Sequence, residues 1–447
     1  MIAFFIVPLL IVLFLLVITV LRFFNKKQFE RAIELINKGD YEAAIHALRE
    51  IQKKSPENRV LNWYLGVCYE KLGKLDLALS EYNKVASGLR FDPPLNEETV
   101  HERIAILSFK LGNITRALKE FQIVSQINEK NADSLYYQGL IYKKKGELRK
   151  SQEVLEKAIA IRDDFYQAKL ELGIVNYELK HFDAARRILS DVIKKQPDNF
   201  DAHYYYALSL EETRMYDRAI EEFGIASQAV NFRFQCYVHI ANIYLSIGKR
   251  EEAHQYFDRA IQTGRGEPLA ILDVKYRYAN SLITTGEIEK ALKLWKEIKE
   301  VMPGYLDVDQ KISIYSEIIR SDALTKFMVT NKMDFLELGK KISRAIGVEV
   351  ERNTVLKDDF LEFVGGYKIG NDEIPCIVNI VKWTNPVGDI PVRELLERMS
   401  EEGVSKGIFV SPSSFTEKAE ELSRIRPIDL ISRKELEGIL KRIFTSK

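Results

Sequence analysis

The feature that most constrains this chain is a small residue that recurs about every 34 positions. Eight such residues follow one another at intervals of 34, apart from one gap of 39 and one of 38: Ala32, Gly66, Ala105, Gly139, Gly173, Ala207, Ala241 and Ala279. Twelve positions after each lies a second small residue, and four positions further on lies a large apolar or aromatic one. This spacing predicts stacked helical hairpins whose paired helices approach closely at the small residues. A stack of this kind is a binding scaffold, and nothing in the pattern indicates catalysis.

The residues inside each period resemble the tetratricopeptide repeat family. The fifth copy carries the full pattern: Leu170, Gly173, Tyr177, Ala185, Leu189, Val192 and Pro197. Eight copies cover residues 28–305, and the two wider gaps fall at 87–94 and 263–268. Because two prolines interrupt the first gap, we expect lengthened loops there that leave the stack intact. The resemblance implies an α-solenoid whose first helices line a concave groove.

Residues at the groove positions of this family form an apolar and aromatic stripe. They are Trp63, Val67, Ile106, Phe109, Tyr136, Leu140, Leu170, Ile174, Tyr177, Tyr204, Leu208 and Asn242. As a set they predict a groove for an amphipathic helix or an extended peptide of a protein partner, although any single residue is as readily a packing residue. Chaperone-binding members clamp a terminal carboxylate with Lys and Asn at the fifth positions. Those residues are missing here, which argues against recognition of chaperone tails.

The first 21 residues contain no charged side chain. As a helix they would extend about 32 Å, enough to cross the hydrocarbon core of a bilayer. No cleavage site follows, so we expect an uncleaved transmembrane anchor at 1–24 rather than a signal peptide. Basic residues follow the uncharged run of 21 residues at Arg22, Lys26 and Lys27. They predict a single-pass protein of the bacterial inner membrane with a cytoplasmic soluble part, a periplasmic orientation being the alternative.

The chain has 447 residues with 66 Lys and Arg against 65 Asp and Glu, a balance that provides no general attraction to nucleic acid. The three cysteines, Cys68, Cys236 and Cys376, are far apart in the sequence, and the six histidines show no metal-ligand spacing. Cys68 and Cys236 lie on apolar faces of repeat helices. We therefore expect no disulfide framework, no metal, no cofactor and no small-molecule substrate.

The pattern changes after Pro303. Residues 306–328 are a predicted capping segment, with one amphipathic helix at 307–328 that closes the solenoid. Residues 329–447 then alternate between helices and strands, which predicts a small α/β domain with a mixed sheet and helices on both faces. Its expected strands lie at 348–355, 359–367, 374–383, 407–410 and 428–431, and its expected helices at 333–346, 391–402, 415–424 and 433–444.

This last domain resembles the Mrr-type branch of the restriction-endonuclease fold. The resemblance rests on the opening helix, the strand Ile377–Trp383, the following turn and helix 385–398, the run Gly407–Thr416 with Ala419, and the ending Ile428–Ile431 with Leu436. Active members hold a metal between an Asp on one strand and an E/Q-x-K motif on the next.

The candidate nuclease positions are Asp358, Asp359, Glu362, Asn379 and Lys382. If Asn379 takes the amide position, Val381 replaces the lysine. If Lys382 is the lysine, Ile380 replaces the acid or amide. Either alignment leaves the motif broken. Residues 326–447 also carry 20 basic and 20 acidic side chains, without the excess of positive charge that DNA binding uses.

These observations predict a membrane-anchored, non-enzymatic adaptor whose repeats bind a protein partner and whose C-terminal domain is a second docking module without nuclease activity. Two alternatives remain open at this point. One is a structural subunit of a large envelope machine, such as a bacterial flagellar motor collar. The other is a membrane-tethered nuclease or DNA-binding protein.

Overall fold

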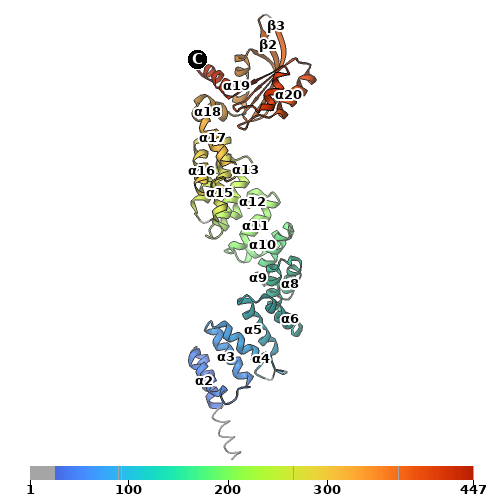
Figure 1. The fold of residues 1–447 in the computed structure, drawn as a ribbon. Helices are drawn as coiled ribbons and strands as arrows, with labels where there is room; N and C mark the ends of the chain where they lie inside the picture. The colour runs from blue at the N-terminus through green and yellow to red at the C-terminus, as the bar shows by residue number, and fades with distance from the viewer. Residues whose placement is uncertain (1–25, 89, 92, 265, 371, 446–447) are drawn as a thin grey trace, which may run out of the picture. The chain divides into compact units, whose positions relative to one another are not determined.

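The structure is a computed structural model that describes residues 26–88, 90–91, 93–264, 266–370 and 372–445. It divides into two compact units, Met1–Ala226 and Ser227–Lys447. Figure 1 shows helical hairpins in both units, and a small sheet with flanking helices that ends the second.

The first unit consists of antiparallel helix pairs. A helix at 26–37 is followed by α2 (Tyr41–Gln52), α3 (Arg59–Lys71), α4 (Leu75–Ala86), α5 (Glu97–Lys110), α6 (Ile114–Ile127), α7 (Ala132–Lys144), α8 (Leu148–Ile161), α9 (Tyr166–Glu178), α10 (Phe182–Lys195), α11 (Phe200–Glu212) and α12 (Tyr216–Ala226). The prediction of a mostly helical tetratricopeptide-repeat solenoid is confirmed.

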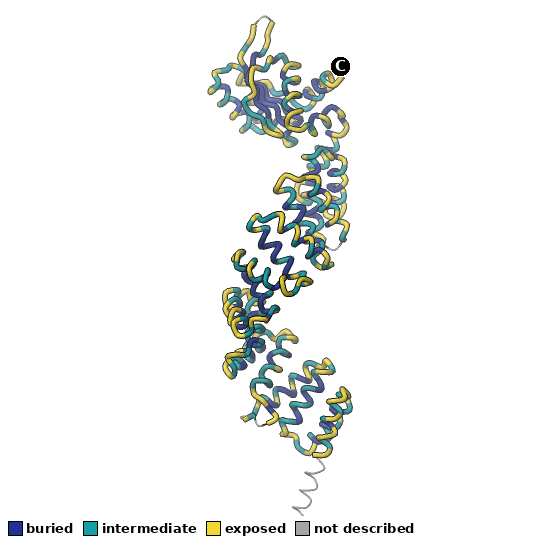
Figure 2. The backbone as a smooth tube through the Cα atoms, turned by 180° about the vertical axis from the view of Figure 1, so that it is seen from behind, coloured by how far each residue is buried: buried dark blue, intermediate teal, exposed yellow. Residues whose placement is uncertain are grey.

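The periodic small residues set how closely the helices of each hairpin approach. A Cβ atom added at Gly173 would lie 2.5 Å from Cδ2 of Leu189, and one added at Gly66 would lie 2.5 Å from the ring of Tyr82. Both large partners are fully buried. Figure 2 shows the buried residues along the helix faces that meet in each hairpin. Each periodic pair, a small residue and a large one 16 positions later, is therefore one packing contact of the core.

The second unit continues the hairpins and then changes architecture. Its helices before the sheet are α13 (Arg233–Ser246), α14 (Arg250–Gln262), α15 (Pro268–Thr284), α16 (Ile288–Val301), α17 (Val308–Ile318), α18 (Asp322–Val329) and α19 (Lys332–Ala345). The single closing helix expected at 307–328 is wrong, because the segment forms α17 and α18. The first helix ends at Ile318, and Ser321 caps the second, since its hydroxyl accepts a hydrogen bond from the Leu324 N–H.

The sheet has the order β1-β2-β3-β4-β5. Its strands are β1 (Val348–Leu356), β2 (Phe360–Ile369), β3 (Asp372–Val381), β4 (Lys406–Val410) and β5 (Ile428–Ile431). The first three pair antiparallel and the last three pair parallel, so the predicted mixed sheet is confirmed. The remaining helices are α20 (Asp389–Glu402), α21 (Glu417–Arg424) and α22 (Arg433–Thr445).

Helices cover both faces of this sheet. Helices α19 and α22 pack against one face, where Phe363, Val378 and Ile408 are buried, and α20 and α21 pack against the other. The apolar core on the α19 side is continuous with that of the last hairpins, and it extends from Phe234 in α13 to Leu440 in α22. Within this unit the sheet domain therefore shares its core with the end of the solenoid.

The predicted single-pass membrane localisation requires correction. In the part of the chain that the structure describes, no helix combines the length and the apolar character needed to cross a bilayer. The predicted anchor, residues 1–24, lies outside the described residues.

Candidate functional site

The predicted nuclease positions divide between the two faces of the sheet. Glu362 in β2 lies directly opposite Asn379 in β3, so both side chains project toward α20. Val381 is on the same face and is fully buried in the apolar cluster beneath α20. The structure thus brings Glu362 and Asn379 together, with Val381 two residues farther along β3, where an E/Q-x-K motif has its lysine.

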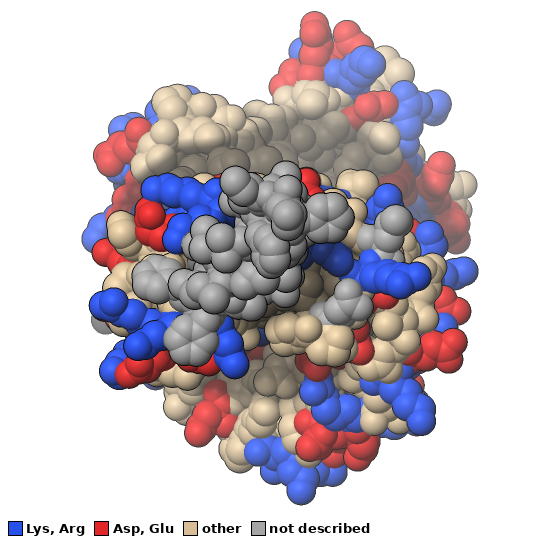
Figure 3. Space-filling model, turned by 90° about the horizontal axis from the view of Figure 1, so that it is seen from below, with Lys and Arg blue, Asp and Glu red and all other residues tan. Residues whose placement is uncertain are grey.

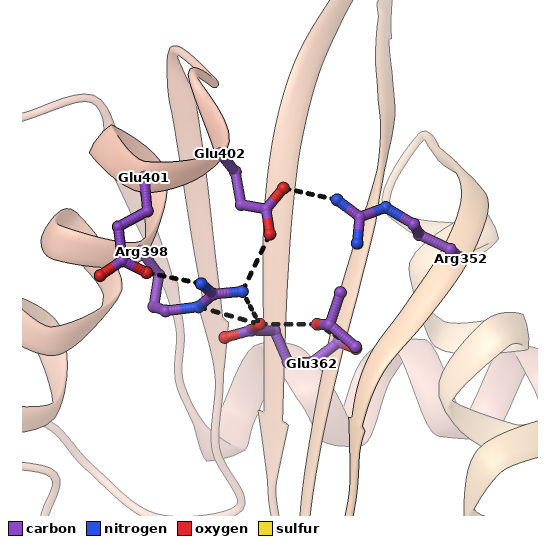
Figure 4. A network of polar contacts seen from close by, with 6 residues as sticks. Arg352, Glu362, Arg398, Glu401 and Glu402 are labelled. Atoms are coloured by element: carbon purple, nitrogen blue, oxygen red, sulfur yellow. Dashed lines mark hydrogen bonds and ion pairs between the residues drawn. The ribbon is translucent and has the colours of Figure 1, made fainter.

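Glu362 is bound to an arginine of the covering helix. Its Oε1 atom accepts hydrogen bonds from Arg398 Nη2 at 3.0 Å and from Thr354 Oγ1 at 2.6 Å. Arg398 also pairs with Glu401 at 2.6 Å and with Glu402 at 3.0 Å, and Glu402 contacts Arg352. Figure 4 shows the Arg398 guanidinium between these carboxylates. The carboxylate at the candidate metal position therefore has an internal cation as its partner.

Asn379 contributes a polar atom without a partner. The residue is 4% exposed, and among the described residues its Oδ1 atom finds no hydrogen-bond donor. No group of three or more His, Cys, Asp or Glu is arranged to hold a metal ion in the described part of the chain. The pair therefore offers one buried carboxylate, already bound to an arginine, and one amide oxygen.

Lys382 lies on the opposite face from Glu362. Its Nζ donates a hydrogen bond to the Thr330 carbonyl at 2.6 Å and lies 4.3 Å from the ring centre of Phe335, at the start of α19. Burial lowers the pKa of its ammonium group to about 8, although Asp358 and Asp359 act in the other direction. Because strand side chains alternate, Lys382 cannot act together with Glu362 on one reacting group.

The two aspartates before β2 lie apart from Glu362 and Asn379. Asp358 and Asp359 are exposed in the turn between β1 and β2. Asp359 accepts a hydrogen bond from the Trp383 indole N–H at 3.1 Å. Of the predicted nuclease positions, Glu362 adjoins Asn379 on one face, and Asp359 adjoins Lys382, whose backbone N–H donates a hydrogen bond to the Asp359 carbonyl at 2.9 Å.

The predicted groove residues all lie on first helices of the hairpins. Ten of the twelve are half-buried, whereas Ile174 and Leu208 are 6% and 7% exposed. Tyr136 packs against Phe165 at 5.0 Å between ring centres, and Tyr204 packs against Phe223 at 6.0 Å. Ile174 and Leu208 therefore present little surface to a partner, while the aromatic residues are partly accessible.

Several residues of these sites were not identified from the sequence. Arg398 and Thr354 hold Glu362, and Tyr137 and Tyr205 lie beside the predicted groove tyrosines Tyr136 and Tyr204. The sequence signal for the tyrosines is the doublet itself, since two adjacent aromatic residues on a first helix project toward neighbouring sides of it. Arg398 gives no comparable signal before the strand register is known.

Charge is evenly mixed on the surface in view in Figure 3, where basic and acidic side chains are interspersed. The net charge of the chain is +1. A single-sign surface of the kind that nucleic-acid-binding proteins present is not visible on that face.

Comparison with known families agrees with these two architectures. Tetratricopeptide repeat models match residues 29–94, 142–211 and 234–265. The restriction endonuclease model Mrr_cat matches residues 330–440. The chain combines tetratricopeptide repeats with a C-terminal restriction-endonuclease-like domain.

Similar proteins match mainly through the repeats. A TPR repeat-containing protein of Methanocaldococcus jannaschii is 24% identical over 314 residues, which are 66% of this chain and 53% of that protein. The BBSome complex member BBS4 of Bos taurus is 23% identical over 315 residues, 62% of this chain and 57% of that protein. The chain thus spans less than two thirds of the length of these relatives.

Two solved structures are similar to part of the chain. A tetratricopeptide repeat protein from Parabacteroides merdae has a TM-score of 0.40 and 22% identity, and it covers 56% of this chain and 96% of its own. YrrB, described as a TPR protein with an unusual peptide-binding site, has a TM-score of 0.37 and 20% identity, covering 40% of this chain and 93% of its own.

Proposed function

We propose that the chain is a protein-interaction scaffold whose repeats bind a segment of a protein partner and whose C-terminal domain is a non-catalytic docking module. The observation that carries the proposal is the pairing of Glu362 with Arg398. It supports the proposal because Glu362, one of three candidate metal carboxylates with Asp358 and Asp359, already has a cation of the chain as its partner. The repeats then remain as the part of the chain with accessible recognition residues.

The repeats support the binding role by their surface. Half-buried aromatic and aliphatic side chains such as Tyr136, Leu170 and Tyr177 follow one another on successive first helices. Partly accessible aromatic side chains are the type that contributes most to protein–protein affinity. The apolar core that the last hairpins share with the sheet domain supports the docking role, because it joins them within the second unit.

Partner binding can be tested by affinity capture from cell lysate with the full-length chain. The variant Tyr136→Ala/Leu170→Ser/Tyr177→Ala should lose the captured protein, because each true anchor contributes about 1–3 kcal/mol. Glu153→Gln/Glu156→Gln, on exposed positions of α8, is the matched control and should retain it. Retention by a triple variant of unchanged helical content would contradict binding at these residues.

Absence of nuclease activity can be tested with supercoiled plasmid and either Mg²⁺ or Mn²⁺. We expect the plasmid to remain supercoiled in the presence of the full-length chain. Nicking that disappears in Glu362→Gln would overturn the proposal and assign a nuclease. Nicking that persists in Glu362→Gln/Asn379→Ala would indicate a contaminating enzyme.

A further inference from the structure

Four tyrosines lie on the first helices of three neighbouring hairpins and form two pairs of contacting rings. Tyr136 and Tyr137 belong to α7, Tyr177 to α9 and Tyr205 to α11, and all four are half-buried. The ring centres of Tyr136 and Tyr137 are 5.4 Å apart, and those of Tyr177 and Tyr205 are 5.9 Å apart. Each ring therefore keeps part of its surface open to a ligand.

Carboxylates surround these rings. The negative charges of Asp133 and Glu102 act on Tyr137, and those of Glu178, Asp201 and Glu171 act on Tyr205. Together with burial, which is the larger cause, they raise the pKa of both phenols. The four tyrosines and these five carboxylates are called the aromatic–acidic face below.

The positive charges on this face do not balance the negative ones. Arg162 pairs with Asp133 at 2.8 Å, and Lys143 pairs with Glu171. Among the described residues, neither Glu178 nor Asp201 has an ion-pair partner within 4.0 Å. Burial raises the pKa of Glu102; the Asn131 amide and Arg103 act against this shift, and the like charges of Asp133 and Glu98 add to it. The face is thus partly desolvated and has an excess of negative charge, which an added cation would relieve.

The chain shows within itself how such a face engages a cation. The Arg162 guanidinium lies 3.6 Å from the ring centre of Phe165 while it donates hydrogen bonds to both carboxylate oxygens of Asp133. A ring face and a carboxylate together bind arginine through the ring quadrupole and through charge-assisted hydrogen bonds. Tyr205 beside Glu178 and Asp201 presents the same pair of groups to an external side chain.

We infer that the aromatic–acidic face binds a segment of a protein partner that presents at least two lysine or arginine side chains. One cation would lie over Tyr205 between Glu178 and Asp201, and another beside Tyr137 near Glu102. Acidic tails, phosphorylated segments and nucleic acids would bring like charge to these carboxylates and are repelled. The inference rests on the proposed binding function of the repeats, and it adds the chemical class of the segment.

A display library of random 12-residue peptides, selected on the immobilised full-length chain, tests this inference. We expect the recovered peptides to contain at least twice the Lys and Arg of the input library. Recovered peptides of neutral or acidic composition would overturn the inference and leave the proposed function standing. Failure to recover any peptide above the uncoated surface would count against peptide binding by the repeats as well.

Variants then locate the binding. Glu171→Gln/Glu178→Gln/Asp201→Asn removes the three carboxylates around Tyr205 and should weaken the selected peptides at least tenfold in fluorescence anisotropy. Glu153→Gln/Glu156→Gln/Asp164→Asn removes the same charge from α8 and the following loop, and should change affinity less than twofold. Equal losses in both triple variants would show general charge attraction and refute the site. Glu178→Gln alone, at an exposed side chain, should weaken binding about threefold without any risk to folding.

Discussion

Arg398 stabilises the C-terminal domain because it is the cation for a buried carboxylate. The Glu362 side chain is only 4% exposed, and among the described residues the Thr354 hydroxyl is the one donor to its carboxylate besides Arg398. Removing one partner of a buried ion pair costs about 3–5 kcal/mol. Since the Arg398 side chain is 34% exposed, part of its attraction is screened by water. We therefore expect Arg398→Met to destabilise the sheet by about 3 kcal/mol, at the lower end of that range.

A double-mutant cycle separates this interaction from general damage to α20. Glu362→Leu leaves Arg398 paired with Glu401 and Glu402, so we expect a cost of about 1 kcal/mol. The double variant places two apolar side chains between the sheet and the helix and should cost about 1–2 kcal/mol, less than the sum of the single effects. Additivity within about 0.5 kcal/mol would refute the coupling.

Hydrogen exchange measured on peptides from β2 and β3 is the suitable assay, because a chain of two units does not unfold in one step. A loss of about 3 kcal/mol corresponds to exchange more than a hundredfold faster. Arg393→Met is the matched control on the same helix, since Arg393 pairs with Asp389 at 3.1 Å on the surface. Its exchange rates should stay within threefold of the parent protein.

Two further variants test the packing and the buried lysine. Gly173→Ala should lower the thermal stability by about 1–3 kcal/mol, because its Cβ would lie 2.5 Å from Leu189. Gly224→Ala, whose Cβ would meet nothing within 4 Å, should raise the stability by up to about 1 kcal/mol. Equal effects of the two variants would contradict the packing argument. Lys382→Met should be more stable than the parent protein at pH 7 by about 2 kcal/mol. The fall of the lysine pKa from 10.5 to about 8 on folding means that burying the charged form costs about 3 kcal/mol, which the variant avoids. The variant also loses the hydrogen bond to Thr330, which reduces its advantage by about 1 kcal/mol. The penalty is complete below pH 8 and absent above pH 10.5, so urea titrations should show the advantage shrinking over that interval; a constant difference would refute the assignment.

The repeat architecture was predictable because each hairpin contains its own pair of contacting residues at a fixed spacing in the sequence. Gly173 and Leu189 lie 16 positions apart in the sequence and touch in the structure, and the same relation recurs from hairpin to hairpin. The closing segment was predicted less well. An apolar period alone does not separate one helix from two, and the break depends on the hydroxyl of Ser321.

The candidate site in the sheet could be predicted only in part. The broken motif is visible in the sequence, but its consequence depends on which strand positions face each other. The register places Glu362 opposite Asn379 and leaves Lys382 on the other face. Arg398 comes from a helix whose position depends on the whole sheet, so no local pattern connects it with Glu362. Long-range pairing, rather than local propensity, decides this site.

Carboxylates have different roles in the two parts of the proposed scaffold. In the sheet domain, Arg398 belongs to the chain and is bound by the buried carboxylate of Glu362, so the pair contributes to stability. On the repeats, Glu178 and Asp201 lie near the half-buried ring of Tyr205 and form no ion pair within 4.0 Å among the described residues, although the charge of Lys143 acts on Glu178. A carboxylate that already has a cationic partner contributes to the stability of the fold. Where a carboxylate has no such partner, the binding of a cationic side chain lowers the free energy. Recognition is therefore expected at the repeats, and the sheet domain contributes a stable surface at their end.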